Sequence, residues 1–178
     1  GPGCKKIEYV TNTTSDLNIY SYLKANPGKY SSITAIVDKS GYAGFLNAYG
    51  SYTMFVPTDS AVSLYLTEIS KTLAGLTETE AKDIVKFHLL QDTLPTNTFK
   101  DGKLPTITMY GQFLVTGVVN NGGVSSILVN RQGTITAANI KTGNGLIHQI
   151  DRVLKPAYKS VAELISDDAR FSIFKQAL

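Results

Sequence analysis

Side chains that commonly build reactive or metal-binding sites are scarce in this chain of 178 residues, which has one cysteine, two histidines and no tryptophan. A single thiol excludes a disulfide within the chain. Without a cluster of histidines and cysteines, the sequence predicts no metal site and no cofactor. Long apolar runs are also missing, and no stretch of about 18 apolar residues predicts a membrane-spanning helix.

Charges are few and mixed: 17 basic and 14 acidic residues give a net charge of +3, and the basic ones are scattered. Because nucleic-acid binding usually needs a clustered basic face, we expect no nucleic-acid partner. The segment most like a phosphate loop, KTGNG at residues 141–145, lacks the lysine–threonine end of a nucleotide site, so we expect no nucleotide either. The 43% hydrophobic content supports one globular domain with a real core.

The one cysteine, Cys4, lies in the opening sequence GPGCKK. Gly1-Pro2 resembles a protease scar left by a fusion tag. Gly3-Cys4 resembles the end of a bacterial lipoprotein signal, in which the cysteine carries the lipid. We therefore expect residues 1–15 to be a tag remnant and tether, with Cys4 as the candidate lipid attachment and a bacterial outer membrane as the location. The alternative is an ordinary exposed thiol.

Apolar residues at helical spacing predict short helices in the first third of the chain. Ser15 or Asp16 can cap a first helix over residues 17–24, which we expect to stop at the Asn-Pro-Gly sequence of residues 26–28. A second helix with the same spacing is predicted over residues 30–37.

A strand and two further helices follow. The sequence YTMFV at residues 52–56 predicts a strand that Pro57 stops, and Thr58 or Asp59 can begin a helix. The sequence TETE at residues 77–80 matches a capping box, in which threonine and glutamate each bond the other's backbone amide. The residues that share the apolar face of this helix are Ala81, Ile84, Val85 and His88.

From residue 104 onwards the pattern changes to short strand-like runs separated by Gly, Asn and Gln turns. The runs are PTITMY, QFLVTGVV, VSSILVNR, GTITAANI and GLIHQIDRVL. The sequence NNGG at residues 120–123 predicts a hairpin, because these residues tolerate positive φ. Helices followed by consecutive strands indicate the α+β class with an antiparallel sheet.

Three segments together resemble the fasciclin-like domain family. They are YTMFVPTDSAV at residues 52–62, KFHLL at 86–90 and NGLIHQIDRVLKP at 144–156, in the family's order and spacing. The resemblance covers residues 16–156 and implies an antiparallel β-wedge or sandwich with several helices packed around it. It also implies a non-enzymatic module for cell–cell or cell–matrix contact. The positions it marks as structural signatures are Thr53, Phe55, Pro57, Thr58, His88, Asn144, Gly145, Ile147, His148, Ile150 and Asp151.

The end of the chain resembles its beginning. KSVAELISDDARFSIFKQAL from Lys159 and LNIYSYLKANPGKYSSITAIV from Leu17 share a short helix, a polar break, an aromatic residue and a second helix. We expect residues 157–178 to be the helical start of a second, truncated fasciclin-like domain. The alternative is a C-terminal helix pair that packs on the first domain.

The two histidines do not predict a catalytic site. His88 lies on the apolar face of its predicted helix, where a histidine bonded to backbone is the usual outcome. His148 and Asp151 lie three apart on a predicted strand, so their side chains point to opposite faces and cannot form a dyad. No serine lies in a Gly-x-Ser-x-Gly motif. We expect Asp151, with Arg152, to tie the strand to a neighbouring loop, and we predict that the chain is not an enzyme.

Recognition is predicted at two places. In animal members of the resembled family, an acidic residue followed by isoleucine, just before the last signature, is implicated in receptor contact. The matching pair here is Asn139-Ile140, which lacks the carboxylate, and we favour a core role for Ile140. Four tyrosines can stack on sugar rings: Tyr42, Tyr49, Tyr52 and Tyr110. The alternative, which we favour for any one of them, is ordinary packing in the core or at its rim. Two hypotheses stay open, an adhesion module that contacts protein or glycan partners and a cell-envelope glycan-binding protein that captures polysaccharide.

Overall fold

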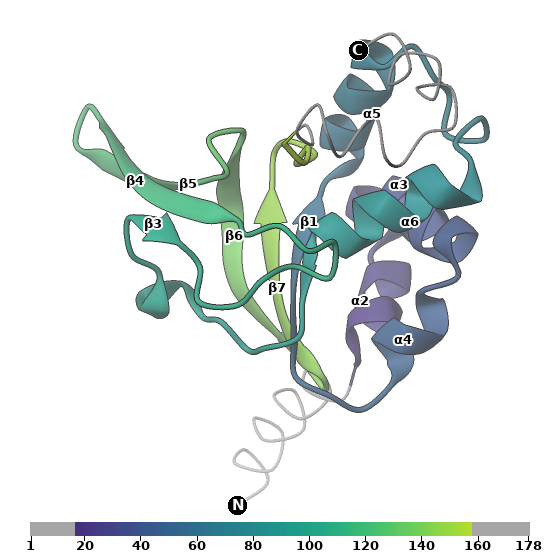
Figure 1. Cartoon of the computed structure of the whole chain (residues 1–178), viewed down its shortest axis with the longest axis horizontal. Coiled ribbons are helices and arrows are strands. Elements are labelled where there is room, and N and C mark those ends of the chain that lie inside the picture. The colour runs from purple at the N-terminus through teal and green to yellow at the C-terminus, as the bar shows by residue number, and fades with distance from the viewer. Residues whose placement is uncertain (1–16, 158–178) are drawn as a thin grey trace, which may run out of the picture.

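The computed structural model describes residues 17–157, which form one curled sheet of seven strands with the main helices gathered on one side (Figure 1). The strands are β1 Tyr52–Pro57, β2 Leu89–Leu90, β3 Gly102–Lys103, β4 Val115–Asn121, β5 Val124–Val129, β6 Gly133–Thr142 and β7 Gly145–Ile150. The helices are α2 Ile19–Ala25, α3 Pro27–Ser40, α4 Ala43–Asn47, α5 Asp59–Glu68 and α6 Glu78–Phe87, with a 3-10 turn, η1, at Thr96–Thr98. The expectations for residues 1–15 and 158–178 lie outside the described residues.

The N-terminal caps predicted for α5 and α6 are confirmed, and the cap predicted for α2 is not. Thr58 caps α5 by accepting from Ala61 N, and the predicted capping box of α6 forms. The expected cap of α2 was wrong: Asn18, rather than Ser15 or Asp16, accepts from Ser21 N at 2.8 Å. Three side chains with capping ability lie close together here, and only the packed position of the helix selects among them.

The break after α2 is shorter than expected, because Pro27 begins α3 instead of separating two helices. A proline at the first helical position costs nothing, since its missing N–H has no intrahelical acceptor there. The helix then runs to Ser40 and ends at Gly41, whose φ of 81° is left-handed.

The sheet is antiparallel, as expected, except for one parallel pair of strands. The strand order is β2-β1-β7-β6-β5-β4-β3, and β1 pairs with β7 in parallel while the other neighbours are antiparallel. Parallel partners need a long crossover connection, and here most of the domain lies between the two strands. Local sequence patterns cannot reveal such a distant pairing.

One predicted strand is almost absent. Of the run PTITMY at residues 105–110, only Thr108 makes a β-bridge, to Leu90. Thr108 instead closes a tight loop, since its backbone N–H donates to Gln112 O at 3.2 Å and its hydroxyl donates to the same oxygen at 2.6 Å. The predicted hairpin at residues 120–123 forms, with its turn at the two glycines.

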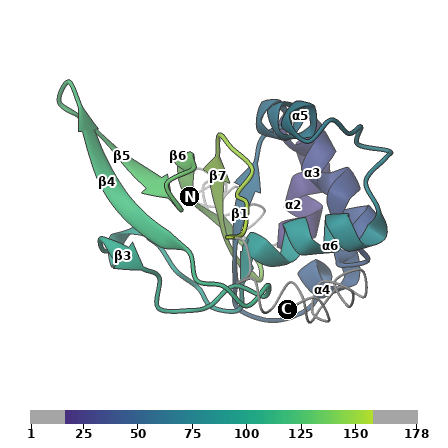
Figure 2. The ribbon, with the colours of Figure 1, turned by 45° about the horizontal axis from the view of Figure 1, so that its top comes forward.

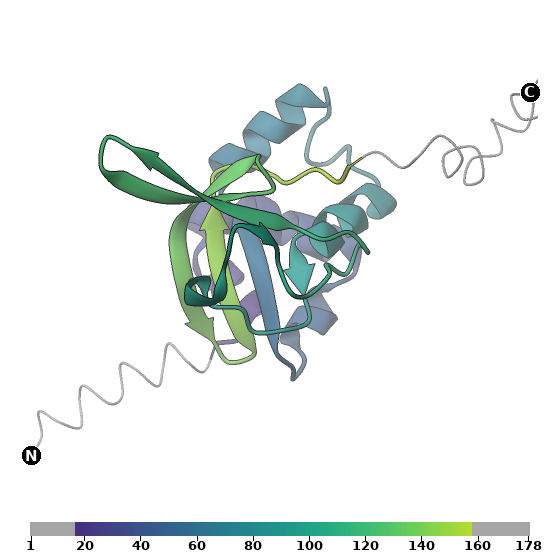
Figure 3. The same ribbon diagram turned by 60° about the vertical axis from the view of Figure 1, so that its left-hand side comes forward.

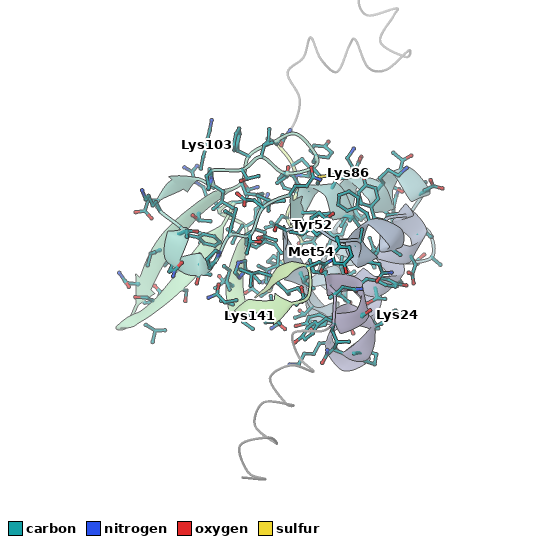
Figure 4. The ribbon with its side chains drawn as sticks, turned by 90° about the horizontal axis from the view of Figure 1, so that it is seen from below. Lys24, Tyr52, Met54, Lys86, Lys103 and Lys141 are labelled. Carbon is teal, nitrogen blue, oxygen red and sulfur yellow. The ribbon has the colours of Figure 1, made fainter. Side chains whose placement is uncertain are left out.

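Two apolar cores lie on the two faces of β1 and β7, which stand between the helices and the rest of the sheet in Figure 2. Met54, Val56 and Ile147 face the helices, and Phe55 and Ile150 face the interior of the curled sheet. All six residues of β1 are buried. Figure 4 shows Met54 and Tyr52 at the centre of the molecule, with its labelled lysines around the periphery. Burying each large apolar side chain contributes about 1.5–3 kcal/mol, so β1 stabilises both halves.

No helix in residues 17–157 is long and apolar enough to cross a membrane.

The turn into β7 joins the helices to the sheet through Asn144 and Gly145. The Asn144 side chain accepts from Ile19 N at 2.9 Å and donates to Leu46 O and Ala48 O at 2.8 and 2.9 Å. Gly145 then passes so close to β1 that a Cβ atom there would lie 1.9 Å from Tyr52 O. The parallel pairing of β1 and β7 therefore requires glycine at this position.

We predict that Gly145→Ala lowers the free energy of unfolding by more than about 3 kcal/mol, because the added methyl overlaps backbone that is itself hydrogen-bonded. Gly28→Ala is the matched control: it lies in α3, has no atom within 4 Å of the new Cβ, and should stay within about 1 kcal/mol of the parent. Urea unfolding measures both. Equal stabilities for the two variants would contradict the tight strand contact.

Candidate interaction surface

His88 follows the last residue of α6 and is fully buried. Its Nδ1–H donates to Ile84 O at 2.7 Å, and its Nε2 accepts the backbone N–H of Leu154 at 2.9 Å. Burial lowers the pKa of His88 to about 4, with the bond to Ile84 opposing the shift. The neutral ring thus joins the end of α6 to the segment that follows β7.

His148 lies on β7 and is also buried. Its ring lies between those of Phe55 and Phe99, with ring centroids 5.4 and 5.5 Å from its own. Its Nε2–H donates to Leu94 O at 2.8 Å, and its Nδ1 accepts the backbone N–H of Asn139 at 3.0 Å. Burial lowers the pKa of this histidine as well. The two histidines are therefore neutral in opposite tautomers.

No reaction centre is assembled around either ring in the described part of the chain. Each imidazole uses both nitrogens on backbone groups, and none of the cavities described below is lined by a histidine. Residues 17–157 contain no group of three or more histidine, aspartate or glutamate side chains that could hold a metal. His148 bonds to Leu94 O and Asn139 N, whereas Asp151 bonds to Thr134 N.

Asp151 bonds to the first residues of β6. Its Oδ1 accepts from Thr134 N at 2.8 Å, and its own backbone N–H donates to Thr134 O at 3.1 Å. Arg152 makes no such tie, because its Nη1 donates only to the adjacent Asp151 O among the described residues.

The remaining signature residues also point inward. Thr53 donates to Asp92 O at 2.7 Å and accepts from Leu94 N at 2.8 Å, which holds the segment after β2. Pro57 ends β1 opposite Ile150. No buried side-chain nitrogen or oxygen in residues 17–157 lacks a hydrogen-bond partner. The polar members of the signatures therefore stabilise the fold and leave no reactive group exposed.

Asn139 and Ile140, the candidate recognition pair, lie at a bulge in β6. Asn139 has a left-handed φ of 56°, and its side chain clamps η1: Oδ1 accepts from Thr96 N at 2.9 Å, and Nδ2 donates to Thr96 Oγ1 at 2.8 Å. Ile140 is half-buried, packs against the helix-side core and pairs with Ile147. This geometry places the pair within the framework, although Asn139 remains accessible to solvent.

A two-stranded ribbon formed by residues 117–127 of β4 and β5 extends away from the body of the domain (Figures 1 and 3). It pairs with β6 only at its base, through Leu128 and Val129. Val118 and Val124 are 60% and 65% exposed, and no charged residue occurs between positions 104 and 130. Sequence reasoning missed this surface, although the long uncharged stretch was a signal for it.

Cavities flank the outer strand of the ribbon on both faces. One, of about 290 Å³, is lined by Phe99, Thr116, Val118 and Ile127. The other, of about 390 Å³, is lined by Val115, Val119, Leu128 and Arg131. The residues that line both cavities are Asp101, Thr116, Gly117 and Val118. An exposed apolar strand with a hollow on each face is typical of a contact surface for another polypeptide.

These features define a class: an α+β domain whose buried polar side chains bond within the fold and whose apolar ribbon is exposed at the edge of the sheet. The Fasciclin domain model matches residues 28–156, and the chain belongs to the Fasciclin domain family. The solved structure of a FAS1 domain pair from the insect cell adhesion molecule Fasciclin I shares the fold, with a TM-score of 0.56 at 20% identity over 82% of this chain and 52% of that one.

Two curated relatives extend the comparison. The chain is 30% identical over 153 residues to the transforming growth factor-beta-induced protein ig-h3 of Sus scrofa, a match that covers 84% of this chain and 21% of that protein. It is 28% identical over 131 residues to Protein sll1483 of Synechocystis, covering 71% and 67%. The chain thus spans about a fifth of the length of the animal relative it matches.

We predict that stability falls as pH falls from about 6.5 to about 4. Over this range the unfolded chain protonates His88 and the folded chain does not, so His88 alone removes about 3 kcal/mol from the free energy of unfolding. Denaturant unfolding at several pH values measures the slope, and His88→Gln should reduce it. If the free energy of unfolding of His88→Gln depends on pH as steeply as that of the parent, His88 is not the group responsible.

Nitrogen-15 NMR tests the tautomers independently. We expect the proton on Nδ1 in His88 and on Nε2 in His148 at pH 7, because each faces a carbonyl oxygen on that side. A shared tautomer, or a charged ring at pH 7, would contradict this arrangement.

Proposed function

We propose that the chain is a non-enzymatic adhesion module that acts outside the cytoplasm and holds a protein partner on the ribbon of residues 117–127. The single observation that supports this is a contrast in burial. The polar signature residues make hydrogen bonds within the domain. In contrast, Val118, Val119 and Val124 are exposed to solvent on an uncharged ribbon. Contact with a partner would remove this apolar surface from water, at about 25 cal/mol per Å² buried.

The relatives support the same role at a coarser level. The insect structure is described as part of a cell adhesion molecule, and that description belongs to that protein. The chain matches about a fifth of the animal relative, and our proposal includes a further copy of the domain after residue 156. It also includes a lipid on Cys4, on the basis of the sequence GPGCKK. Anchored, repeated modules would turn weak single contacts into firm adhesion through effective concentration.

A second candidate function is glycan capture, favoured by one side chain. Of the four tyrosines considered, Tyr52 is buried, Tyr42 packs on Phe45 and Tyr110 packs on Phe87. Tyr49 alone is fully exposed. It directly precedes Gly50 and Ser51, which line a shallow cavity of about 310 Å³. The other polar side chains of this cavity are Thr93, Lys141, Thr142 and Asn144. An aromatic face beside hydroxyl and amine groups is suited to a sugar ring.

The adhesion proposal predicts that Val118→Ser with Val124→Ser lowers binding at least tenfold, since two exposed apolar contacts are removed. Chain-coated beads are captured on surfaces of collagen, fibronectin or laminin, and the retained fraction is measured. Leu64→Ser, at an exposed apolar position on α5, is the matched control and should bind like the parent. Equal retention of the ribbon variant and the parent would sink the proposed contact surface.

The glycan alternative predicts saturable binding to a polysaccharide on an array, lost in Tyr49→Ala and kept in Tyr49→Phe, because stacking needs the ring and not the hydroxyl. Both variants should unfold within about 0.5 kcal/mol of the parent, as expected for a surface change. Binding that survives Tyr49→Ala would remove Tyr49 as the sugar platform.

A further inference from the structure

The outer edge of β4 is only partly covered by another strand. In the sheet order β3 is the last strand beyond β4, and it has two residues, which pair with Val115 and Thr116. From Gly117 to Asn121, no strand in residues 17–157 lies on that side. Five residues of β4 therefore form an open sheet edge along the exposed ribbon.

The turn of the hairpin determines which backbone groups face outward. Gly122 and Gly123 form a two-residue turn with φ of 58° and 84°, so Asn121 and Val124 are a hydrogen-bonded pair. Alternation then directs the backbone groups of Val118 and Asn120 away from β5. The bond from Val118 N to Asp101 Oδ1 agrees with this direction.

Protection of this edge is weak. Natural edge strands are usually blunted by charged side chains, proline or a bulge, and β4 has none of these. Among the described residues, the Asp101 side chain accepts a hydrogen bond from the outward-facing backbone N–H of Val118. The distance from Val118 N to Asp101 Oδ1 is 3.3 Å, which is long for a hydrogen bond. A strand that approaches this edge meets no charge on β4 itself.

We propose that β4 pairs antiparallel with β4 of a second copy of the chain, which joins the two sheets across a twofold axis at Val119. This inference rests on the proposed role of the ribbon as a contact surface. β3 blocks the edge at Thr116, and the turn ends it after Asn121. Val118 and Asn120 are the residues whose backbone groups point outward. Within that span, only an axis at Val119 places Val118 of each copy opposite Asn120 of the other.

The chemistry of β4 suits pairing with itself. Because β4 itself has no charge, the two paired strands do not repel each other, and the axis sets one Val119 beside the other. Val124 lies on the same face of the ribbon, one diagonal step from Val119. Pairing requires Asp101 to release Val118 N, which its long bond permits. An interface formed by five residues of β4 from each copy is small, so we expect a weak and transient dimer, which suits modules that act in clusters.

Sedimentation equilibrium tests the pairing on the chain of residues 1–178 carrying Cys4→Ser, which removes disulfide-linked dimers. We expect the mass to rise from 19.2 kDa towards twice that value at concentrations on the order of 100 µM and above. Val119→Lys should weaken the dimer at least tenfold, because it sets two like charges at the axis. Asp101→Ala should strengthen it severalfold, because it removes the competing acceptor. Leu64→Lys is the control on α5 and should dimerise like the parent.

A charge-swap experiment tests the register. Val119→Lys and Val119→Glu chains should each be monomeric alone and should form a mixed dimer when combined, since opposite charges then meet at the axis. A dimer insensitive to Val119→Lys, or no rescue on mixing, would overturn the proposed register and pairing. A chain that stays monomeric throughout would overturn self-pairing. If the chain stays monomeric but still loses adhesion in the Val118 and Val124 variant, the proposed function stands without self-pairing.

Discussion

The parallel contact between β1 and β7 supports both halves of the molecule. Its two strands lie between the helix-side core and the interior of the curled sheet, and β1 is buried along its whole length. The contact closes at Gly145, which lies against Tyr52 without room for a side chain, while Asn144 bonds α2 and the end of α4. This turn therefore adds hydrogen bonds between helices and sheet to the apolar contacts that the helices make along β1 and β7.

The two histidines extend this framework by bonding backbone to backbone. His88 joins the end of α6 to the segment after β7, and His148 joins the segment after β2 to the bulge of β6. A neutral imidazole suits this task because it donates on one side and accepts on the other. Protonation would place a second donor against a backbone N–H, so the same bonds that hold the fold make it sensitive to acid.

The ribbon has the opposite character, because it is held only at its base and carries apolar side chains in solvent. Because the polar signature residues bond within the domain, the proposed contact falls on its remaining surface. Backbone groups and small apolar side chains along an open edge provide binding without any charge or metal. In the proposed function, this open edge serves in adhesion and the signature residues stabilise the fold.

The sequence by itself determined the family, the α+β class, the buried strand of β1, the capping box of α6 and the hairpin at Gly122-Gly123, because each depends on neighbouring residues in the chain. Local spacing also placed His88 on the apolar face of its helix, and His88 is buried. Only the tertiary structure decided the parallel pairing of β1 with β7, the partners of Asn139 and Asp151, and the open edge of β4. These depend on residues distant in sequence, and burial and hydrogen bonding between such residues arise only when the whole chain has packed.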